Sequence, residues 1–227
     1  MSEILKSAAV EKQAVSDEEL ALMSAQALRP LGADEVFAFK LAACDNQIDR
    51  ELERFTDSTL DKFAELFVGR PVLRDHRWTA GSQTARIYAA ATETDGSTKR
   101  LILRAYMPRN SHTKATVDAI EMGILREASV GVMVERSVCS VCGGDYHECI
   151  HQRGRTYEEK RCHVELDGAL DAYEVSLVAV PAQPEAGVVK RYEAKEKAGT
   201  ETGVDEDSIL RMAQAMQMME EKRFGGI

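Results

Sequence analysis

A turn signal at Asp95-Gly96 joins two β-prone segments, QTARIYAAATE (83–93) and KRLILRAYM (99–107). An Asp-Gly pair between two such runs is typical of a tight β-hairpin. A third β-prone segment, PVLRDH (71–76), precedes this pair. The sequence therefore predicts a hairpin with one further strand directly before it.

Other segments add strands and a few helices around this hairpin. Alternating or β-prone runs occur at VFAFKLAA (36–43), SVGVMVERSV (129–138) and YEVSLVAVP (173–181). Helical spacing occurs in SDEELALMSAQALR (16–29), TDSTLDKFAELFVG (56–69) and TKATVDAIEMGIL (113–125). Because two helices interrupt the strands without alternating with them, the order favours an α+β domain or a small barrel over a parallel βαβ sheet.

The 227 residues suit one main domain with appendages. We predict an N-terminal arm at 1–31, a main domain at 32–190 and a charged C-terminal tail with a helix at 191–227. Four Met residues lie along that tail helix. The tail either docks on a partner through an amphipathic face or is a plain extension.

The charge balance restricts the classes of partner. The chain has 29 Lys and Arg residues against 38 Asp and Glu residues, which gives a formal net charge of -9. No overall basic field would attract nucleic acid or an anionic membrane, so we expect protein partners. Neither a spanning helix nor a secretory signal is evident, so we expect the chain to stay in a cytoplasm.

A cysteine-rich segment, CSVCGGDYHECIHQRGRTYEEKRCH (139–163), lies between two of the predicted strands. Four of the five cysteines fall within it, a poor layout for a disulfide framework. A CxxC pair followed by Gly-Gly lets two thiolates hold one ion from a tight turn, and structural Zn²⁺ takes four N or S ligands. We predict a structural zinc held by four of five candidates: Cys139, Cys142, Cys149, His151 and Cys162. A redox-active CxxC and reduced surface cysteines are the alternatives.

Serine hydrolases need a base to accept the serine proton and a third group to orient that base. Taken from the residues alone, Asp75-His76 at a strand end and Ser129 among small residues are unremarkable. However, three strings occur in order: FVGRPVLRDHRW (67–78), REASVGVMVE (126–135) and DAYEVSLVAVPAQPEAG (171–187). Together they resemble the signature of the tailed-phage prohead serine proteases, in a prophage-type version that carries the cysteine-rich insert at 137–163.

The resemblance covers roughly residues 36 to 190 and implies roles for three residues. His76 of the DH motif corresponds to the general base, and Ser129 of the SVG motif to the nucleophile. Glu174 corresponds to the third member, although related herpesvirus-type proteases use a second histidine instead. Glu174 and Ser176 would share one face of a strand, so that the carboxylate reaches a surface site. The alternative is an exposed carboxylate at a strand end.

The resemblance also implies a fold and a function. The implied fold is α+β: a small, mostly antiparallel β-barrel with helices around it, as in the herpesvirus proteases. The implied enzyme is a serine endopeptidase that cuts capsid or scaffold protein, and itself, through an acyl-enzyme at Ser129. Portal and other prohead components are further expected partners, in the cytoplasm of a bacterial host within the assembling prohead, and self-association is left open. Catalysis would need no cofactor.

Two rival functions remain at this point. The first is a zinc-stapled capsid assembly or scaffold factor that keeps the fold but does not cut. The second is a redox or metal-dependent enzyme that works through the cysteines. Chelation separates them, because removing a structural metal lowers stability whereas removing a catalytic metal abolishes activity directly.

Overall fold

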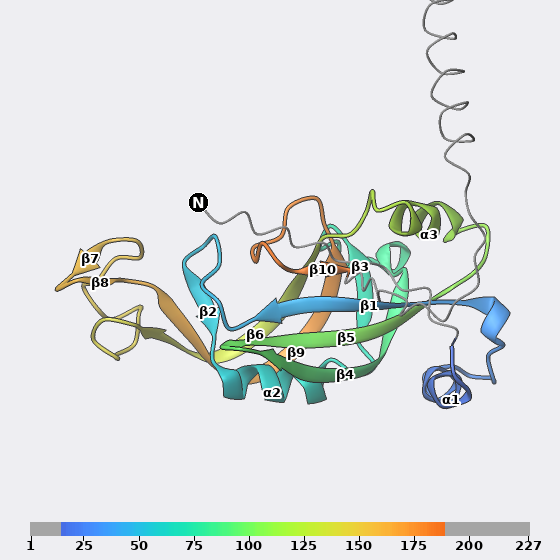
Figure 1. The fold of residues 1–227 in the computed structure, drawn as a ribbon, viewed down its shortest axis with the longest axis horizontal. Helices are drawn as coiled ribbons and strands as arrows, with labels where there is room; N and C mark the ends of the chain where they lie inside the picture. Colours follow the sequence, from blue (N-terminus) through green and yellow to red (C-terminus); the bar gives the residue numbers. More distant parts are fainter. Residues whose placement is uncertain (1–14, 189–227) are drawn as a thin grey trace, which may run out of the picture. The chain divides into compact units, whose positions relative to one another are not determined.

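The computed structural model describes residues 15–188 (Figure 1). The first fourteen residues of the predicted arm, and the predicted tail with its Met-rich helix, lie outside the described residues. The described part is an α+β fold with a large mixed sheet and few helices. Its α-helices are α1 (Asp17–Ser24), α2 (Asp57–Leu66) and α3 (Lys114–Glu121). Its strands are β1 (Val36–Asp45), β2 (Glu53–Phe55), β3 (Pro71–Arg74), β4 (Ala85–Asp95), β5 (Thr98–Pro108), β6 (Ala128–Cys139), β7 (Thr156–Tyr157), β8 (Lys160–Arg161), β9 (Val164–Leu177) and β10 (Gly187–Val188).

The main sheet runs in the order β10-β1-β5-β4-β3-β9-β2, and β6 also pairs with β9. The predicted β4–β5 hairpin is present, but its two-residue turn is Gly96-Ser97, one residue later than predicted, because Asp95 still pairs with Thr98. Gly96 adopts the left-handed backbone (φ 58°). Most pairs are antiparallel, but β3 and β2 both run parallel to β9. Strand β9 therefore connects β3, and through it the β4–β5 hairpin, to β6.

No run of paired strands closes the sheet into a barrel within residues 15–188. One isolated antiparallel bridge, between Glu127 and Gly187, connects the start of β6 to β10. Two backbone hydrogen bonds flank this bridge: the Ala128 N–H donates to Ala186 O (3.3 Å), and the Val188 N–H donates to Arg126 O (2.5 Å). The α+β class is thus confirmed, whereas the barrel stays a prediction.

Helix α2 covers one face of the sheet and forms much of the core with it (Figure 1). Thr56 caps its N-terminus by accepting the Thr59 N–H. Leu60, Phe63 and Phe67 recur at helical spacing and are fully buried. Burying each of these side chains contributes roughly 1.5–3 kcal/mol. This apolar face fixes which side of the sheet is core.

Helix α1 belongs to the predicted arm, yet it packs against the main domain. Ser16 and Glu19 form a reciprocal capping box at its start. Met23 is fully buried with Val36 and Tyr88 in a second, smaller core. The Tyr88 hydroxyl also donates to Glu19 (3.0 Å). The described part of the arm is therefore attached to β1 and β4 by packing.

Strand β9 is longer than the sequence suggested. The predicted strand began at Tyr173, but β9 begins at Val164 and ends at Leu177. The first part of β9 contains several acidic residues and Gly168, which has a left-handed φ of 76°. It therefore lacks the alternating apolar residues that would predict a strand. This part of the chain is a strand because it pairs with β6 on one side and with β2 and β3 on the other, although its local β propensity is low.

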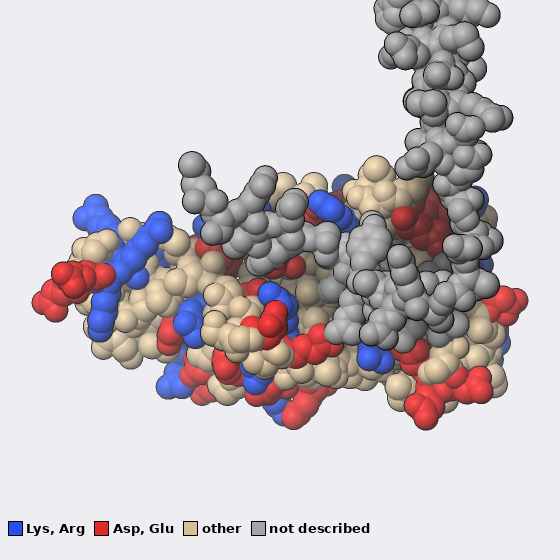
Figure 2. Space-filling model, viewed as in Figure 1, with Lys and Arg blue, Asp and Glu red and all other residues tan. Residues whose placement is uncertain are grey.

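The face displayed in Figure 2 carries Lys and Arg side chains interleaved with Asp and Glu side chains. Neither sign dominates the described part of this face, so nothing there resembles the single-sign patch of a nucleic-acid site. Between residues 15 and 188, no helix is both long and apolar enough to cross a membrane.

Candidate functional site

The backbone reverses sharply where β3 ends. Asp75 and His76 both have left-handed backbones, with φ of 55° and 52°. Such a conformation costs a non-glycine residue roughly 1–2 kcal/mol. Two hydrogen bonds to β9 hold the turn: the Asp75 N–H donates to Leu177 O (3.1 Å), and the His76 N–H donates to Ser176 Oγ (3.0 Å). Left-handed non-glycine residues cluster at functional sites, but they also form ordinary tight turns, as Glu158 and Glu159 do between β7 and β8.

The turn places the His76 ring against Glu174 of β9. His76 Nδ1 lies 2.7 Å from Glu174 Oε1. When Glu174 is ionised, its carboxylate can only accept hydrogen bonds, so in a neutral His76 ring Nδ1 would carry the proton and Nε2 would keep its lone pair. This tautomer is the one that a general base needs. The His76 side chain is 41% exposed, so the free Nε2 has access to an incoming group.

Ser176 connects the two members of this pair. Its hydroxyl donates to Glu174 Oε2 (2.6 Å) and also accepts the His76 backbone N–H. Ser176 is fully buried, so these hydrogen bonds do not compete with water. The carboxylate therefore uses one oxygen for the histidine ring and the other for the serine, and both the ring and its backbone are positioned from β9.

Gly131 makes room for the carboxylate. It pairs with Glu174 across the β6–β9 ladder. A Cβ built at residue 131 would lie 2.4 Å from Glu174 Oε1 and 3.2 Å from the carboxyl carbon. Any side chain at this position would displace the carboxylate from His76. The close approach of Glu174 thus explains why the SVG motif has a glycine at position 131.

Ser129 lies on the same sheet face, two residues before Gly131. It pairs directly with Ser176 across β6 and β9, and Leu73 of β3 pairs with Ser176 from the other side. Directly paired residues have Cα atoms about 4.5–5.5 Å apart, so Ser129 is the next neighbour of the serine that contacts His76. Among the described residues, no hydrogen bond joins the Ser129 and His76 side chains.

The alternative for Glu174, an exposed carboxylate at a strand end, is wrong, because the residue is only 2% exposed. The strand parity was right: Val175 and Leu177 face the core, and Glu174 and Ser176 face the other way. The carboxylate is nevertheless buried because the His76 turn covers that face.

A β-bulge widens the site beside Glu174. Gly131 and Val132 are consecutive on β6, but their partners on β9 are Glu174 and Ala172, which leaves Tyr173 as the extra residue. Bulges redirect side chains and often lie next to active sites. Here Tyr173 and Glu174, although adjacent in sequence, both line one hollow of about 320 Å³.

The cysteine-rich insert connects the end of β6 to the start of β9 and carries the small β7–β8 hairpin (Figure 1). Four of its side chains could hold a metal ion: ligand atoms of Cys139, Cys142, Cys149 and His151 all lie within 4.8 Å of one another. His151 Nδ1 is buried and has no hydrogen-bond partner among residues 15–188. A buried imidazole nitrogen without a partner is costly unless a ligand satisfies it.

The fifth candidate, Cys162, lies close to the same group. Its Sγ is 3.9 Å from Cys139 Sγ, and both residues are fully buried. The structure thus brings all five predicted candidates together, with Cys162 beside the four that form one compact set.

The chemistry at Cys139 suits a metal ligand. Burial raises the pKa of its thiol, but hydrogen bonds from the backbone N–H groups of Cys142 and Val141, together with those from the Cys142 and Cys149 side chains, outweigh burial and bring the pKa down to about 6. Metals bind the thiolate and not the thiol. The tight turn after Cys139 therefore provides donors that favour the ligating form.

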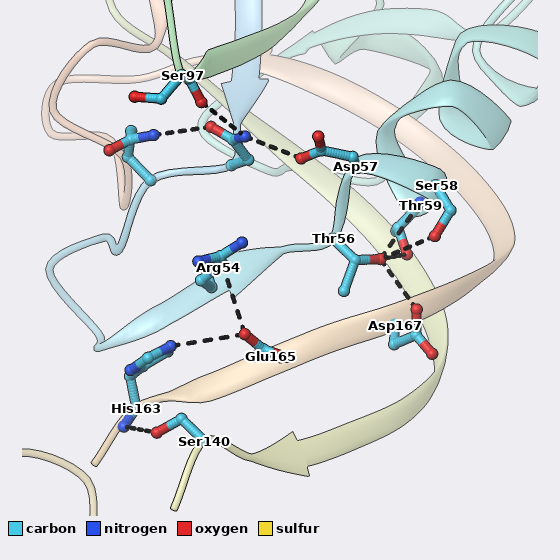
Figure 3. A network of polar contacts seen from close by, with 12 residues as sticks. Arg54, Thr56, Asp57, Ser58, Thr59, Ser97, Ser140, His163, Glu165 and Asp167 are labelled. Carbon is cyan, nitrogen blue, oxygen red and sulfur yellow. Dashed lines mark hydrogen bonds and ion pairs between the residues drawn. The ribbon is translucent and has the colours of Figure 1, made fainter. Parts of the chain in front are cut away.

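Polar contacts attach the base of the insert to the sheet (Figure 3). The His163 N–H donates to Ser140 Oγ (2.9 Å), which ties the start of β9 to the end of β6. Glu165 lies between Arg54 of β2 (3.9 Å) and the His163 ring (3.8 Å). These contacts fix both ends of the insert to the main sheet.

No known protein family, curated protein or solved structure matches this chain. The site therefore rests on its own geometry. The family resemblance suggested roles for His76, Glu174 and Ser129, of which the structure brings His76 and Glu174 into contact, but it gave no role to Ser176, Gly131 or Tyr173. Only the β6–β9 register, with its bulge, identifies those three.

Proposed function

We propose that this chain is a serine endopeptidase of the tailed-phage prohead type, with Ser129 as nucleophile, His76 as general base and Glu174 as the residue that orients the base. The observation that carries the proposal is the 2.7 Å contact between His76 Nδ1 and the buried Glu174 carboxylate, one strand away from Ser129. A histidine fixed in this tautomer beside a partly exposed serine is the arrangement that activates a hydroxyl.

In the proposed reaction, Ser129 Oγ attacks the peptide carbonyl and its proton passes to His76 Nε2. The tetrahedral intermediate then collapses, the C–N bond breaks, and the leaving amine takes the proton from His76. Water hydrolyses the acyl-enzyme by the same route, which regenerates the Ser129 hydroxyl. Glu174 stabilises the imidazolium that forms at each step.

The missing hydrogen bond between Ser129 and His76 favours a second candidate, a non-cutting capsid assembly or scaffold factor with the same fold. It does not exclude catalysis, because such hydrogen bonds are often long before substrate binds. The buried carboxylate that contacts the His76 ring favours the protease, since a scaffold has no use for such a pair.

We also propose that the insert binds a structural zinc that does not act in catalysis. A closed set of three cysteines and one histidine leaves no open coordination position, whereas catalytic zinc keeps one for water. The cluster is carried by the insert, which precedes the first residue of β9, whereas Glu174 lies near the last residue of that strand. Because the cysteine cluster is separated from the His76–Glu174 pair, we infer that the metal stabilises the insert and takes no part in catalysis.

The finer fold and setting are part of the same proposal. The bridge between Glu127 and Gly187 supports closure into a small, herpesvirus-protease-like barrel. The proposed substrates are capsid or scaffold segments and the chain's own termini, cut inside an assembling prohead in a bacterial cytoplasm. Portal and other prohead components are the proposed partners.

The first test asks whether Ser129 is a nucleophile. The purified chain is treated with a fluorophosphonate probe, and the modified residue is located by peptide mass mapping. We expect labelling at Ser129 that is lost in Ser129→Ala and His76→Ala but kept in Ser137→Ala, a matched serine on the same strand. Labelling that persists in Ser129→Ala would contradict the proposed nucleophile.

The second test asks what is cut. The chain is co-expressed with the capsid protein encoded beside its gene, and capsid size is compared on gels for the parent and for Ser129→Ala. Processing by the parent alone is expected. Probe labelling of Ser129 without capsid processing would keep the serine hydrolase and reject the proposed substrate.

A further inference from the structure

The hollow beside Glu174 has mainly apolar and aromatic walls. Trp78 and Tyr173 form one side, with ring centroids 5.3 Å apart, and Leu73 of β3 and Ala80 contribute to the rest. Trp78, the only tryptophan in the sequence, is 67% exposed. A large aromatic side chain that is left this exposed at a pocket is typical of a binding site.

Among the described residues that line the hollow, Arg70 is the one cation, and its charge is already neutralised. Arg70 Nη2 is paired with Asp171 Oδ1 at 2.7 Å, and its Nε donates to Leu66 O (3.2 Å). Glu174, the anion in the wall, is committed to His76 and Ser176. A charged ligand group would therefore lose its hydration in the hollow without gaining an unpaired partner of opposite charge.

We propose that this hollow is a specificity subsite that receives one large apolar side chain of the peptide substrate, of the leucine, methionine or phenylalanine kind. A volume of about 320 Å³ admits such a side chain together with the adjoining peptide backbone. The inference rests on the proposed function, because Glu174 belongs both to the wall and to the His76 pair, which puts the hollow next to the residues proposed to cut the peptide.

The bulge explains why the subsite lies at this place. Tyr173 is the extra residue of β9, so its ring turns to the same side as the Glu174 carboxylate. On the other side, the turn at Asp75 and His76 leads straight into Trp78. The two features that build the His76–Glu174 pair thus also place the two aromatic rings that form the subsite.

Occupancy can be measured without catalysis, since Trp78 is the sole source of tryptophan fluorescence. The full-length Ser129→Ala chain is titrated with N-acetyl amides of leucine, phenylalanine, glutamate, lysine and glycine. We expect a saturable change in emission with the leucine and phenylalanine amides alone. Equal responses to the glutamate or lysine amides, or no saturable response at all, would overturn the subsite.

A variant that fills the hollow provides the control. Ala80 is exposed, so Ala80→Phe adds a ring to the wall without opening a cavity in the core. It should abolish the fluorescence response. Thr94→Phe, at an exposed position of the β4–β5 hairpin, adds the same ring elsewhere and should leave the response unchanged. A response that survives in Ala80→Phe would place the amide outside the hollow.

Cleavage specificity gives the second readout. The parent chain digests a proteome-derived peptide library, and the cut sites are read by mass spectrometry. One position near the cut should be enriched in large apolar residues, and Trp78→Ala should lower kcat/KM for such peptides by about 10- to 100-fold. Enrichment that is unchanged in Trp78→Ala would overturn the subsite. Failure of the proposed protease gives a different pattern: the fluorescence response persists, but no cut depends on Ser129.

Discussion

Glu174 Oε1 lies 2.7 Å from His76 Nδ1, although the two residues are 98 positions apart in the chain. The carboxylate is buried and the histidine is half exposed, so the pair combines a fixed, desolvated acceptor with an accessible base. This relationship connects the fold to the proposed chemistry, and each part of it can be altered separately.

Replacing the carboxylate with an amide tests the role of Glu174. In Glu174→Gln the shape is kept, but the negative charge that stabilises the imidazolium is lost. We expect the rate of fluorophosphonate labelling at Ser129 to fall about 10³-fold or more, as for carboxylate-to-amide changes in serine triads. Thermal unfolding should show that the variant is folded. A rate within threefold of the parent would remove Glu174 from the site.

Ser176 is expected to act as a positioning residue. Ser176→Ala removes the hydroxyl that serves both Glu174 and the His76 backbone, and leaving these buried groups without partners should cost roughly 1–3 kcal/mol of stability. We expect kcat on a library-derived peptide to fall while KM stays unchanged. Ser24→Ala, which removes a hydroxyl that accepts the Leu31 N–H far from the site, should lower stability without changing kcat. Equal effects of the two variants on kcat would show that Ser176 has only a structural role.

The close approach at Gly131 predicts a steric loss of function. In Gly131→Ala the new methyl group would displace the Glu174 carboxylate, and we expect Ser129 labelling to be abolished and stability to fall by about 1–3 kcal/mol. In Gly81→Ala the added Cβ meets nothing within 4 Å, so this variant should behave as the parent. Both are measured by probe labelling and chemical denaturation. Normal labelling of Gly131→Ala would show that the carboxylate position is unimportant.

Removing the metal should show whether it stabilises the fold or takes part in catalysis. We expect one zinc per chain by elemental analysis, and chelation should lower the unfolding temperature while Ser129 labelling of the still-folded protein persists. Loss of labelling at a temperature where the chelated protein remains folded would instead favour a metal-dependent enzyme.

The fourth ligand can be assigned by comparing two variants. Because His151 belongs to the compact set and its Nδ1 has no partner, His151→Ala should lose the zinc, whereas Cys162→Ser should retain it. Cys44→Ala, which removes a cysteine of β1 outside the cluster, is the control and should retain it as well. The opposite result for His151 and Cys162 would assign Cys162 as the ligand.

Local sequence determined the elements whose causes are local. Ser16 and Thr56 cap the helices that begin directly after them, and Gly96-Ser97 turns the hairpin. The cysteine cluster is local as well, because its close spacing brings the ligands together with little chain between them. In these cases, interactions between residues a few positions apart are enough to specify the outcome.

Tertiary structure alone decided how the site is assembled. Nothing in the spacing of His76 and Glu174 indicates contact; the parallel pairing of β3 with β9 and a strained turn bring them together. Likewise, the β6–β9 register places Ser129 opposite Ser176 and Gly131 opposite Glu174, and one bulge turns Tyr173 toward the hollow. A strand's register depends on pairing with distant partners, and a shift of one residue would send every side chain to the other face.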